Sequence, residues 1–315
     1  MGLFLYLHFR FNLTTMRCKV LFYCLLFVVL SACAQGKTMF DADLLLSDVK
    51  ILASDMFEGR KTGTEGSKKA RNYIINQFET LEVKPLINAF EQGFDFSYAN
   101  QKYTGTNVLG IIHGATKPEE YIVISAHYDH LGIQNSTVYN GADDNASGVS
   151  ALLAFAQYFK KNPPKHSVIL AAFDAEELGL EGSKYYVKHP IVSEDKIVCN
   201  INMDMISRSN NSELFIVGAK THKSLEALLN EFTSASKKVK LTLGHDGSDN
   251  LEDWTYSSDH ASFYRKEIPF LYFGVADHKD YHKHTDDYDK IHPDFYKEVV
   301  RQIILLFNKI DQITF

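Results

Sequence analysis

Residues 121–148 read YIVISAHYDHLGIQNSTVYNGADDNASG, and the rest of the chain is best interpreted outward from this stretch. It begins with an apolar, β-branched run that predicts a buried strand, and this run leads into His127 and Asp129. A short polar loop then brings Asp143 and Asp144, and a turn of small residues opens into an apolar run that predicts a helix. Sites in open α/β sheets form at the carboxyl ends of strands, so we expect these side chains to meet there.

The remaining chain alternates between apolar strands and amphipathic helices. Strands are expected in residues 93–114 (a pair), 121–126, 167–173, 197–203, 213–217 and 269–275, and helices in 41–53, 67–81, 147–161, 182–188, 224–233 and 293–310. Residues 54–66 are expected to form a loop. This alternation predicts an α/β fold, a three-layer sandwich whose mixed, mostly parallel central sheet carries helices on both faces.

Composition and charge are ordinary for a globular protein. Of the 315 residues, 45% are hydrophobic and 23% are charged, and the formal net charge is −6. Lysine and arginine are scattered rather than gathered in one block, which argues against nucleic acid as a partner. No linker-like or low-complexity tract divides the chain, so we expect residues 35–315 to form a single domain.

The N-terminal residues 1–34 have the pattern of a secretory signal peptide. Arg17 and Lys19 precede the apolar run 20–30, and small residues follow it. The alternative is a single membrane anchor, but the run is short for a bilayer span. We therefore expect an exported protein.

Two processing sites overlap at the end of this segment. Ala32-Cys33-Ala34 fits a signal peptidase site before Gln35, whereas residues 30–33 resemble a bacterial lipobox. In the second case Cys33 carries a lipid and attaches the protein to the bacterial cell envelope; in the first the protein is periplasmic or secreted. We favour the lipoprotein. Lipidation would leave Cys199 alone, and a disulfide framework is then excluded.

Clusters of histidine and carboxylate side chains follow the predicted strands. These clusters are His127 with Asp129, Asp143 with Asp144, Glu176 with Glu177, Asp204, and His282. So many acids at one edge of a sheet would repel each other without cations, and two divalent metal ions resolve this repulsion. Mixed histidine and carboxylate ligands with open coordination positions suit zinc in a catalytic role.

Five motifs in this order carry a resemblance to a known family. They are HYD (127–129), GADDNASG (141–148), AEELGLEGS (175–183), NMDMIS (202–207) and YHKHTDD (281–287). Together they resemble the co-catalytic dizinc exopeptidases, which include bacterial leucyl aminopeptidases, glutamate carboxypeptidase II, the transferrin receptor ectodomain and, more remotely, glutaminyl cyclase. The resemblance covers roughly residues 105–300, and FEGRKTGTEG at 57–66 is also similar to the N-terminal part of secreted bacterial members.

The resemblance implies two zinc ions per chain and a role for each ligand. His127 and Asp204 would bind one zinc, Glu177 and His282 the other, and Asp144 would bridge them. It also implies a cis peptide bond between Asp144 and Asn145. Glu176 would be the general base that takes a proton from the nucleophilic water and passes it to the leaving amine.

Two neighbouring acids receive different interpretations. Asp129 is expected to accept a hydrogen bond from His127 and fix its tautomer in support of catalysis, although a plain turn residue is the alternative. Asp143 is expected to be a solvated loop acid and not a ligand. Three further histidines are expected to be loop or surface residues: His130, His245 and His278. Of these, only His278 lies near enough to His282 in the sequence to compete for its ligand role.

Three residues are candidates for substrate binding. Tyr281 could hydrogen-bond the oxyanion, or it could simply pack. Arg208 could contact a substrate carboxylate, and its alternative is a surface arginine. Asp259 lies in a Ser-Asp-His sequence that could support the pocket, or it could cap a helix. Trp254 lies in a loop that could wall the pocket.

The predicted function is that of a zinc-dependent exopeptidase acting on peptides, with aminopeptidase activity favoured. A carboxypeptidase or dipeptidase on the same fold is the alternative, and an acidic pocket, which captures an ammonium, would separate an aminopeptidase from these. The acids Asp143, Asp246 and Asp249 favour the aminopeptidase mildly. Glutaminyl cyclase and a non-catalytic receptor-like module fit less well, because both zinc-ligand sets and Glu176 are intact.

Overall fold

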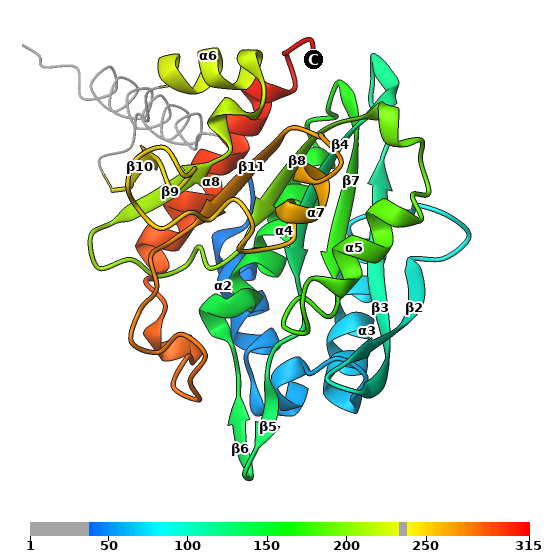
Figure 1. Ribbon diagram of the computed structural model, residues 1–315, viewed down its shortest axis with the longest axis vertical. Helices are drawn as coiled ribbons and strands as arrows, with labels where there is room; N and C mark the ends of the chain where they lie inside the picture. The colour runs from blue at the N-terminus through cyan, green and yellow to red at the C-terminus, as the bar shows by residue number, and fades with distance from the viewer. Residues whose placement is uncertain (1–37, 233–237) are drawn as a thin grey trace, which may run out of the picture. The chain divides into compact units, whose positions relative to one another are not determined.

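A mixed sheet of nine strands forms the centre of the computed structural model, which describes residues 38–232 and 238–315 (Figure 1). Its order is β1-β3-β7-β4-β8-β11-β9-β10, with β2 paired to β3. The strands are β1 (Lys84–Pro85), β2 (Glu91–Tyr98), β3 (Gln101–Ile112), β4 (Lys117–His127), β7 (His166–Phe173), β8 (Ile197–Met203), β9 (Glu213–Val217), β10 (Lys240–Leu243) and β11 (Phe270–Gly274). The described residues from Phe40 to Phe315 belong to one compact unit.

The four central strands β7, β4, β8 and β11 are parallel, and antiparallel strands flank them. Every residue of β7 is buried, as expected for a parallel strand that is covered on both faces. The predicted strands are therefore found, and the sheet has the mixed, mostly parallel character that the sequence indicates.

Helices cover both faces of the sheet (Figure 1). One face carries α2 (Ala42–Leu52), α3 (Glu65–Thr80), α4 (Gly148–Phe159) and α8 (Pro293–Ile310), and the other carries α5 (Glu181–Lys188) and α7 (His260–Tyr264). A further helix, α6 (Lys223–Glu231), lies beside α8. The prediction of a three-layer α/β sandwich is confirmed.

Local sequence explains several helix boundaries. Asp41 caps α2, because its carboxylate accepts hydrogen bonds from the amides of Asp43 and Leu44. Thr64 caps α3 through the amide of Ser67. The helix α8 begins with Pro293 in its first turn, where an amide N–H has no helical acceptor and its absence in proline removes no hydrogen bond.

Some elements differ from the expectation. The loop expected at 54–66 contains a 3₁₀ helix (Asp55–Arg60), and a π-helical turn (Ala142–Ser147) precedes α4. A small hairpin, β5 (Gly132–Gln134) and β6 (Thr137–Tyr139), joins two parts of the opening stretch. Neither this hairpin nor β10 and α7 were expected, because each is too short to leave a clear periodic pattern.

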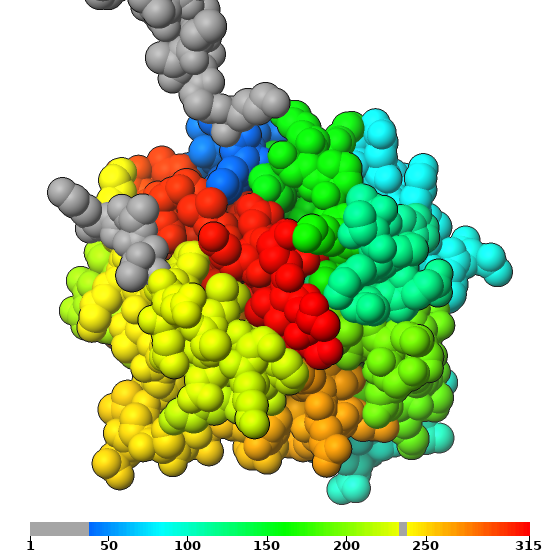
Figure 2. All heavy atoms as spheres, turned by 90° about the horizontal axis from the view of Figure 1, so that it is seen from above, coloured from blue at the N-terminus to red at the C-terminus, as the bar shows by residue number. Residues whose placement is uncertain are grey.

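The C-terminal residues, red in Figure 2, lie on the surface beside the yellow-green residues of α6. The carboxylate of Asp311 accepts hydrogen bonds from the amides of Lys165 (2.7 Å) and His166 (2.9 Å), which ties the end of α8 to the start of β7. The candidate site lies at the other, carboxyl end of the strands.

The predicted signal segment 1–34, including Cys33, lies outside the described residues. Among the residues that the structure does describe, no helix combines the length and the apolar character needed to cross a bilayer. Cys199 is buried with a free thiol.

Candidate metal centre

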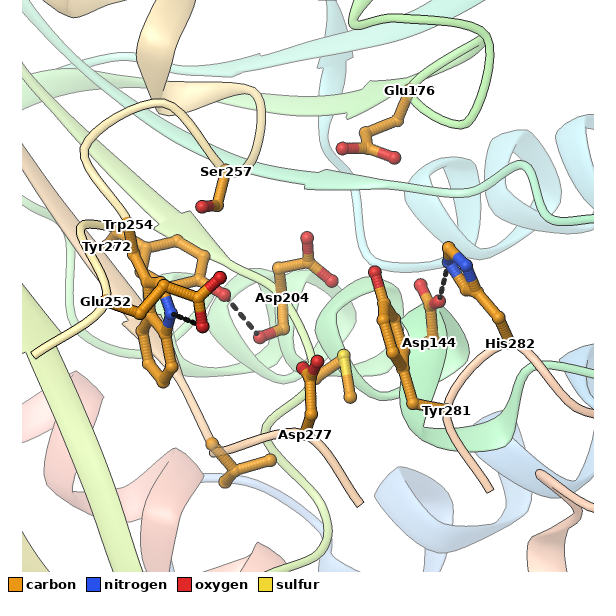
Figure 3. Close-up of a pocket in the computed structure, with 12 residues that line it drawn as sticks. Asp144, Glu176, Asp204, Glu252, Trp254, Ser257, Tyr272, Asp277, Tyr281 and His282 are labelled. Carbon is orange, nitrogen blue, oxygen red and sulfur yellow. Dashed lines mark hydrogen bonds and ion pairs between the residues drawn. The ribbon is translucent and has the colours of Figure 1, made fainter. Parts of the chain in front are cut away.

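The predicted zinc ligands converge at the carboxyl edge of the sheet. His127 ends β4, and Glu177 and Asp204 come from the segments that follow β7 and β8. Asp144 lies in the π-helical turn before α4, and His282 lies in the loop after β11. The parent strands are neighbours, so five side chains that are distant in the sequence meet in one place; Figure 3 draws Asp144, Asp204 and His282 of this set.

The ligand atoms form two groups that share Asp144. In the first group, His127 Nε2 lies 3.3 Å from Asp144 Oδ1 and 3.2 Å from Asp204 Oδ1. In the second, His282 Nε2 lies 3.2 Å from Asp144 Oδ2 and 3.3 Å from Glu177 Oε2. Each oxygen of Asp144 therefore faces a different group, as a bridging carboxylate would.

These spacings fit zinc. Two ligand atoms that each lie about 2.0 to 2.1 Å from one tetrahedral zinc ion are separated by about 3.3 Å. The four distances within the two groups are 3.2 to 3.3 Å. Imidazole nitrogens and carboxylate oxygens are also ordinary zinc donors, so the described residues could hold metal in both positions.

The turn that carries Asp144 has an unusual backbone. The peptide bond between Asp144 and Asn145 is cis, as the family resemblance implied. The carboxylate of Asp286 accepts hydrogen bonds from the amides of Asp143 and Asp144, at 3.1 to 3.2 Å. The Asn145 side chain donates to the carbonyl of Met203 at 2.9 Å, which joins the turn to β8.

The buried side chain of Arg60 stabilises the backbone around the same turn. Its side chain is only 1% exposed, and its guanidinium donates hydrogen bonds of 2.6 to 2.9 Å to backbone carbonyls. The accepting carbonyls belong to Leu52, Tyr128, Asn140 and Gly141. Arg60 had no role predicted from the sequence, although it lies in the segment FEGRKTGTEG, which is similar to the N-terminal part of secreted bacterial members of the family.

Asp129 supports the site differently from the expectation. His127 Nδ1 lies 3.2 Å from the backbone oxygen of Asp129 and 3.7 Å from its carboxylate. The carboxylate instead accepts hydrogen bonds from the amides of Glu176 (3.0 Å) and Glu177 (3.3 Å). Asp129 thus holds the turn that presents both glutamates, and its main-chain oxygen faces the imidazole.

Glu176 lines the cavity beside the ligands, opposite Asp144 and His282 (Figure 3). Burial raises the pKa of its carboxyl well above the usual range. The positive charge of His127 opposes this increase in pKa, and the negative charge of Asp204 adds to it. The Glu176 carboxylate belongs to neither ligand group and lines the same cavity as Asp144, Asp204 and His282.

Asp143 is not a solvated loop acid, and that expectation was wrong. Its side chain is fully buried, and Oδ1 accepts hydrogen bonds of 2.7 Å from both the amide and the hydroxyl of Ser207. Its other oxygen lies 3.1 Å from His278 Nε2. His278 is therefore engaged by Asp143 and joins the loop of His282 to the turn of Asp144.

Two other histidines lie in loops, as expected, but neither is exposed. His130 is buried, and its Nδ1 lies 2.7 Å from Glu177 Oε1. His245 is buried too, and its ring stacks on Trp254 at a centroid distance of 3.6 Å. The His130 contact does not follow from the local sequence, because Glu177 comes from a different loop, whereas His245 and Trp254 belong to the same loop.

The cavity beside the ligand groups combines apolar walls with free acids. Met205, Trp254, Tyr272 and Val275 contribute apolar surface. Glu252 and Asp277 add carboxylates that belong to neither ligand group, and the described lining contains no lysine or arginine. Asp143, Asp246 and Asp249, the acids that favoured an aminopeptidase in the sequence, do not line it; Asp246, for example, pairs with Lys220 at 3.1 Å.

Of the three candidate substrate contacts, only Tyr281 lines this cavity, with its hydroxyl end directed into it (Figure 3). Arg208 is buried and forms an ion pair of 2.6 Å with Asp280. Asp259 is fully buried, makes no hydrogen bond as a helix cap, and has a pKa raised to about 7, chiefly by burial. Neither Arg208 nor Asp259 therefore lines the cavity.

Paired groups of metal-ligating side chains at the carboxyl edge of a mixed sheet are typical of metal-dependent α/β hydrolases. The sequence matches Peptidase family M28 over residues 107–307, more than half of its length, and the chain belongs to this family. The resemblance to the co-catalytic zinc exopeptidases is thereby confirmed.

Individual relatives share part of the sequence or the fold. Aminopeptidase YwaD of Bacillus subtilis (strain 168) is 32% identical over 178 residues, which cover 55% of this chain and 35% of that protein. BSAP, a zinc aminopeptidase from Bacillus subtilis, has a TM-score of 0.68 at 18% identity, covering 87% of this chain and 97% of that one. Bacteroides thetaiotaomicron glutaminyl cyclase bound to N-acetylhistamine has a TM-score of 0.67 at 21% identity, covering 85% and 98%.

The matched curated relatives are longer than this chain's share of them. The chain spans 22% to 53% of the length of three curated relatives that it matches. The two solved structures are less than 25% identical to it, so they bear on the fold alone. The choice between reactions on this fold therefore depends on the site.

Proposed function

We propose that this protein is a zinc-dependent aminopeptidase with two zinc ions per chain. The observation that carries this proposal is the cavity beside the ligand groups, whose described lining has the free carboxylates Glu252 and Asp277 and no cationic lysine or arginine. Such a cavity attracts the ammonium group of a peptide N-terminus and repels a C-terminal carboxylate. A carboxypeptidase would need the opposite charge.

The ligands in this proposal are those that the family resemblance implied. His127 and Asp204 would hold one ion, Glu177 and His282 would hold the other, and Asp144 would contribute an oxygen to each. When bound, zinc lowers the pKa of a water molecule and polarises the scissile carbonyl. The ligand spacings of 3.2 to 3.3 Å support this arrangement.

Glu176 moves the proton in the proposed reaction. Its carboxylate accepts a proton from the attacking water and donates it to the nitrogen of the leaving peptide. The Asp129 carboxylate accepts a hydrogen bond from the Glu176 amide and so keeps Glu176 in place. The Tyr281 hydroxyl, which lines the cavity, donates a hydrogen bond to the oxygen of the attacked carbonyl. Trp254 and Tyr272 enclose the side chain of the N-terminal residue, and Glu252 and Asp277 contact its ammonium.

The proposal also includes export and the boundaries of the domain. The basic start, apolar core and small-residue end of residues 1–34 support removal of this segment, which leaves 35–315 as the enzyme domain. The lipobox-like sequence supports lipidation of Cys33 and attachment to the bacterial cell envelope. Mass spectrometry of the mature N-terminus would distinguish a lipidated Cys33 from a cleavage before Gln35.

A panel of aminoacyl peptides with free and acetylated N-termini tests the activity. We expect hydrolysis of the free substrates and little hydrolysis of the acetylated ones. Glu176→Gln should lower kcat by about 10²- to 10⁴-fold, whereas Glu181→Gln, on the nearby helix α5, should have little effect.

Three results would contradict the proposal. Equal hydrolysis of acetylated and free substrates would exclude an aminopeptidase. Cyclisation of an N-terminal glutamine without peptide hydrolysis would identify a glutaminyl cyclase. Unchanged kcat in Glu176→Gln would exclude the proposed base.

A further inference from the structure

His130 lies beside the second ligand group, although the resemblance gave it no role. It follows β4 by three residues and is only 1% exposed. Its Nδ1 lies 2.7 Å from Glu177 Oε1 and 3.7 Å from Asp144 Oδ2. The three side chains offer atoms close enough together to surround one metal ion. His130 is therefore either a ligand itself or a hydrogen-bond partner of a ligand.

The distance between His130 and Glu177 identifies a hydrogen bond. Two ligands of one tetrahedral zinc ion lie about 3.3 Å apart, as the other pairs in this site do. At 2.7 Å, His130 Nδ1 and Glu177 Oε1 are too close for that arrangement, but they are at the ordinary distance of a strong N–H to carboxylate hydrogen bond. His130 is therefore a donor to Glu177.

The two oxygens of the Glu177 carboxylate then have different contact partners. Oε2 lies 3.3 Å from His282 Nε2, which is the ligand spacing, while Oε1 accepts from His130. A carboxylate whose second oxygen is held by a hydrogen bond presents one oxygen to a metal ion. His130 thus fixes the rotation of the Glu177 carboxylate about its last side-chain bond.

The His130 ring has little freedom to adopt another position. A Cβ atom on Gly141 would lie 2.6 Å from His130 Cδ2, so the ring packs directly against the Gly141 backbone. The other ring nitrogen, Nε2, is buried and has no hydrogen-bond partner among residues 38–232 and 238–315. In the described structure, the polar contacts of the ring therefore point toward the second ligand group alone.

We propose that His130 is a positioning residue for the second metal ion, and that it acts by donating a hydrogen bond from Nδ1 to Glu177. This inference rests on the proposed two-zinc centre. Partners that orient a metal ligand typically change metal affinity by about 10- to 100-fold when they are removed. Loss of the His130 hydrogen bond should weaken binding of the ion held by Glu177 and His282 and leave binding of the ion held by His127 and Asp204 unchanged.

Two substitutions of similar size separate the hydrogen bond from packing. His130→Asn keeps an N–H donor near the position of Nδ1, whereas His130→Leu fills the space without a donor. Zinc content and the two zinc dissociation constants would be measured by chelator competition for the wild type and both variants, together with the melting temperature of each metal-free protein. These readouts do not depend on catalysis.

We expect the wild type to bind two zinc ions and His130→Leu to bind one of them about 10- to 100-fold more weakly. His130→Asn should recover most of this affinity, and the metal-free melting temperatures of the two variants should be similar. Equal zinc affinities for the two variants would overturn the role of His130 while leaving the two-zinc centre intact. A wild type that binds a single zinc would overturn both.

Discussion

Replacement of Asp48 by asparagine should stabilise the protein at neutral pH by about 3 kcal/mol. Asp48 is buried on α2, and its Oδ1 accepts a hydrogen bond of 2.5 Å from the Tyr73 hydroxyl. Burial raises the pKa of Asp48 from 3.8 to about 6, and the hydrogen bond from Tyr73 only partly opposes this. The difference between these pKa values corresponds to about 3 kcal/mol, at about 1.4 kcal/mol for each pH unit.

The direction of the pH dependence follows from the protonation of Asp48 in the folded and unfolded chain. Below pH 3.8 the carboxyl is protonated in both, so its full contribution to stability is present. Between pH 3.8 and about 6 the unfolded chain has already released the proton, so the free energy of unfolding falls as the pH rises. Above that range the loss is complete. Asparagine has no proton to release, and its amide oxygen can still accept from Tyr73.

Urea unfolding between pH 4 and pH 8 measures this effect. The stability of Asp48→Asn minus that of the wild type should increase by about 2.5 kcal/mol from the lowest to the highest pH, because part of the loss has already occurred at pH 4. Asp43→Asn, at an exposed position on the same helix, serves as the control and should show no such increase. A difference between Asp48→Asn and the wild type that stays constant with pH would refute the reasoning.

Three further predictions concern the site. Arg60→Met removes the Arg60 donor from the buried carbonyls of Leu52, Tyr128 and Asn140 and should lower the free energy of unfolding by about 3 kcal/mol or more in urea; a loss below about 1 kcal/mol would contradict this. Removal of zinc by a chelator should lower the melting temperature, since a ligand at 100 times its Kd stabilises by about 2.7 kcal/mol per site; an unchanged melting temperature would count against the metal centre. Glu252→Gln should raise KM for substrates with a free N-terminus several-fold with little change in kcat, and an unchanged KM would exclude Glu252 from ammonium binding.

The sheet and the ligand cluster could be predicted because both depend on long apolar strands. The runs that became β4, β7, β8 and β11 are continuous and buried, so their position in the sequence fixes where their carboxyl ends lie. His127 ends one such strand, and Asp204 directly follows another. The structure brings them together for the reason that the sequence indicated.

Residues whose surroundings come from other segments could not be predicted in this way. Asp143 is buried because Ser207 and His278, which are far away in the sequence, contact its carboxylate. His130 is buried because it faces Glu177 from a different loop. A polar residue in a loop usually lies in solvent, and only the tertiary contacts reveal the exceptions.

The supporting residues also explain how so acidic a centre can be organised by the protein itself. Asp286 and Asp129 accept hydrogen bonds from the amides of the turns that carry Asp144 and Glu177, and Arg60 donates to the carbonyls around them. All of these contacts use backbone atoms of the ligand-bearing turns and leave the ligand oxygens available to a metal ion. The turns should therefore keep their shape in the metal-free protein, and His130 in addition contacts the Glu177 carboxylate directly, through Oε1. On this view, chelation should reduce stability without unfolding the loops of the site, and hydrogen exchange at the amides of Asp144 and Glu177 should remain slow after zinc is removed.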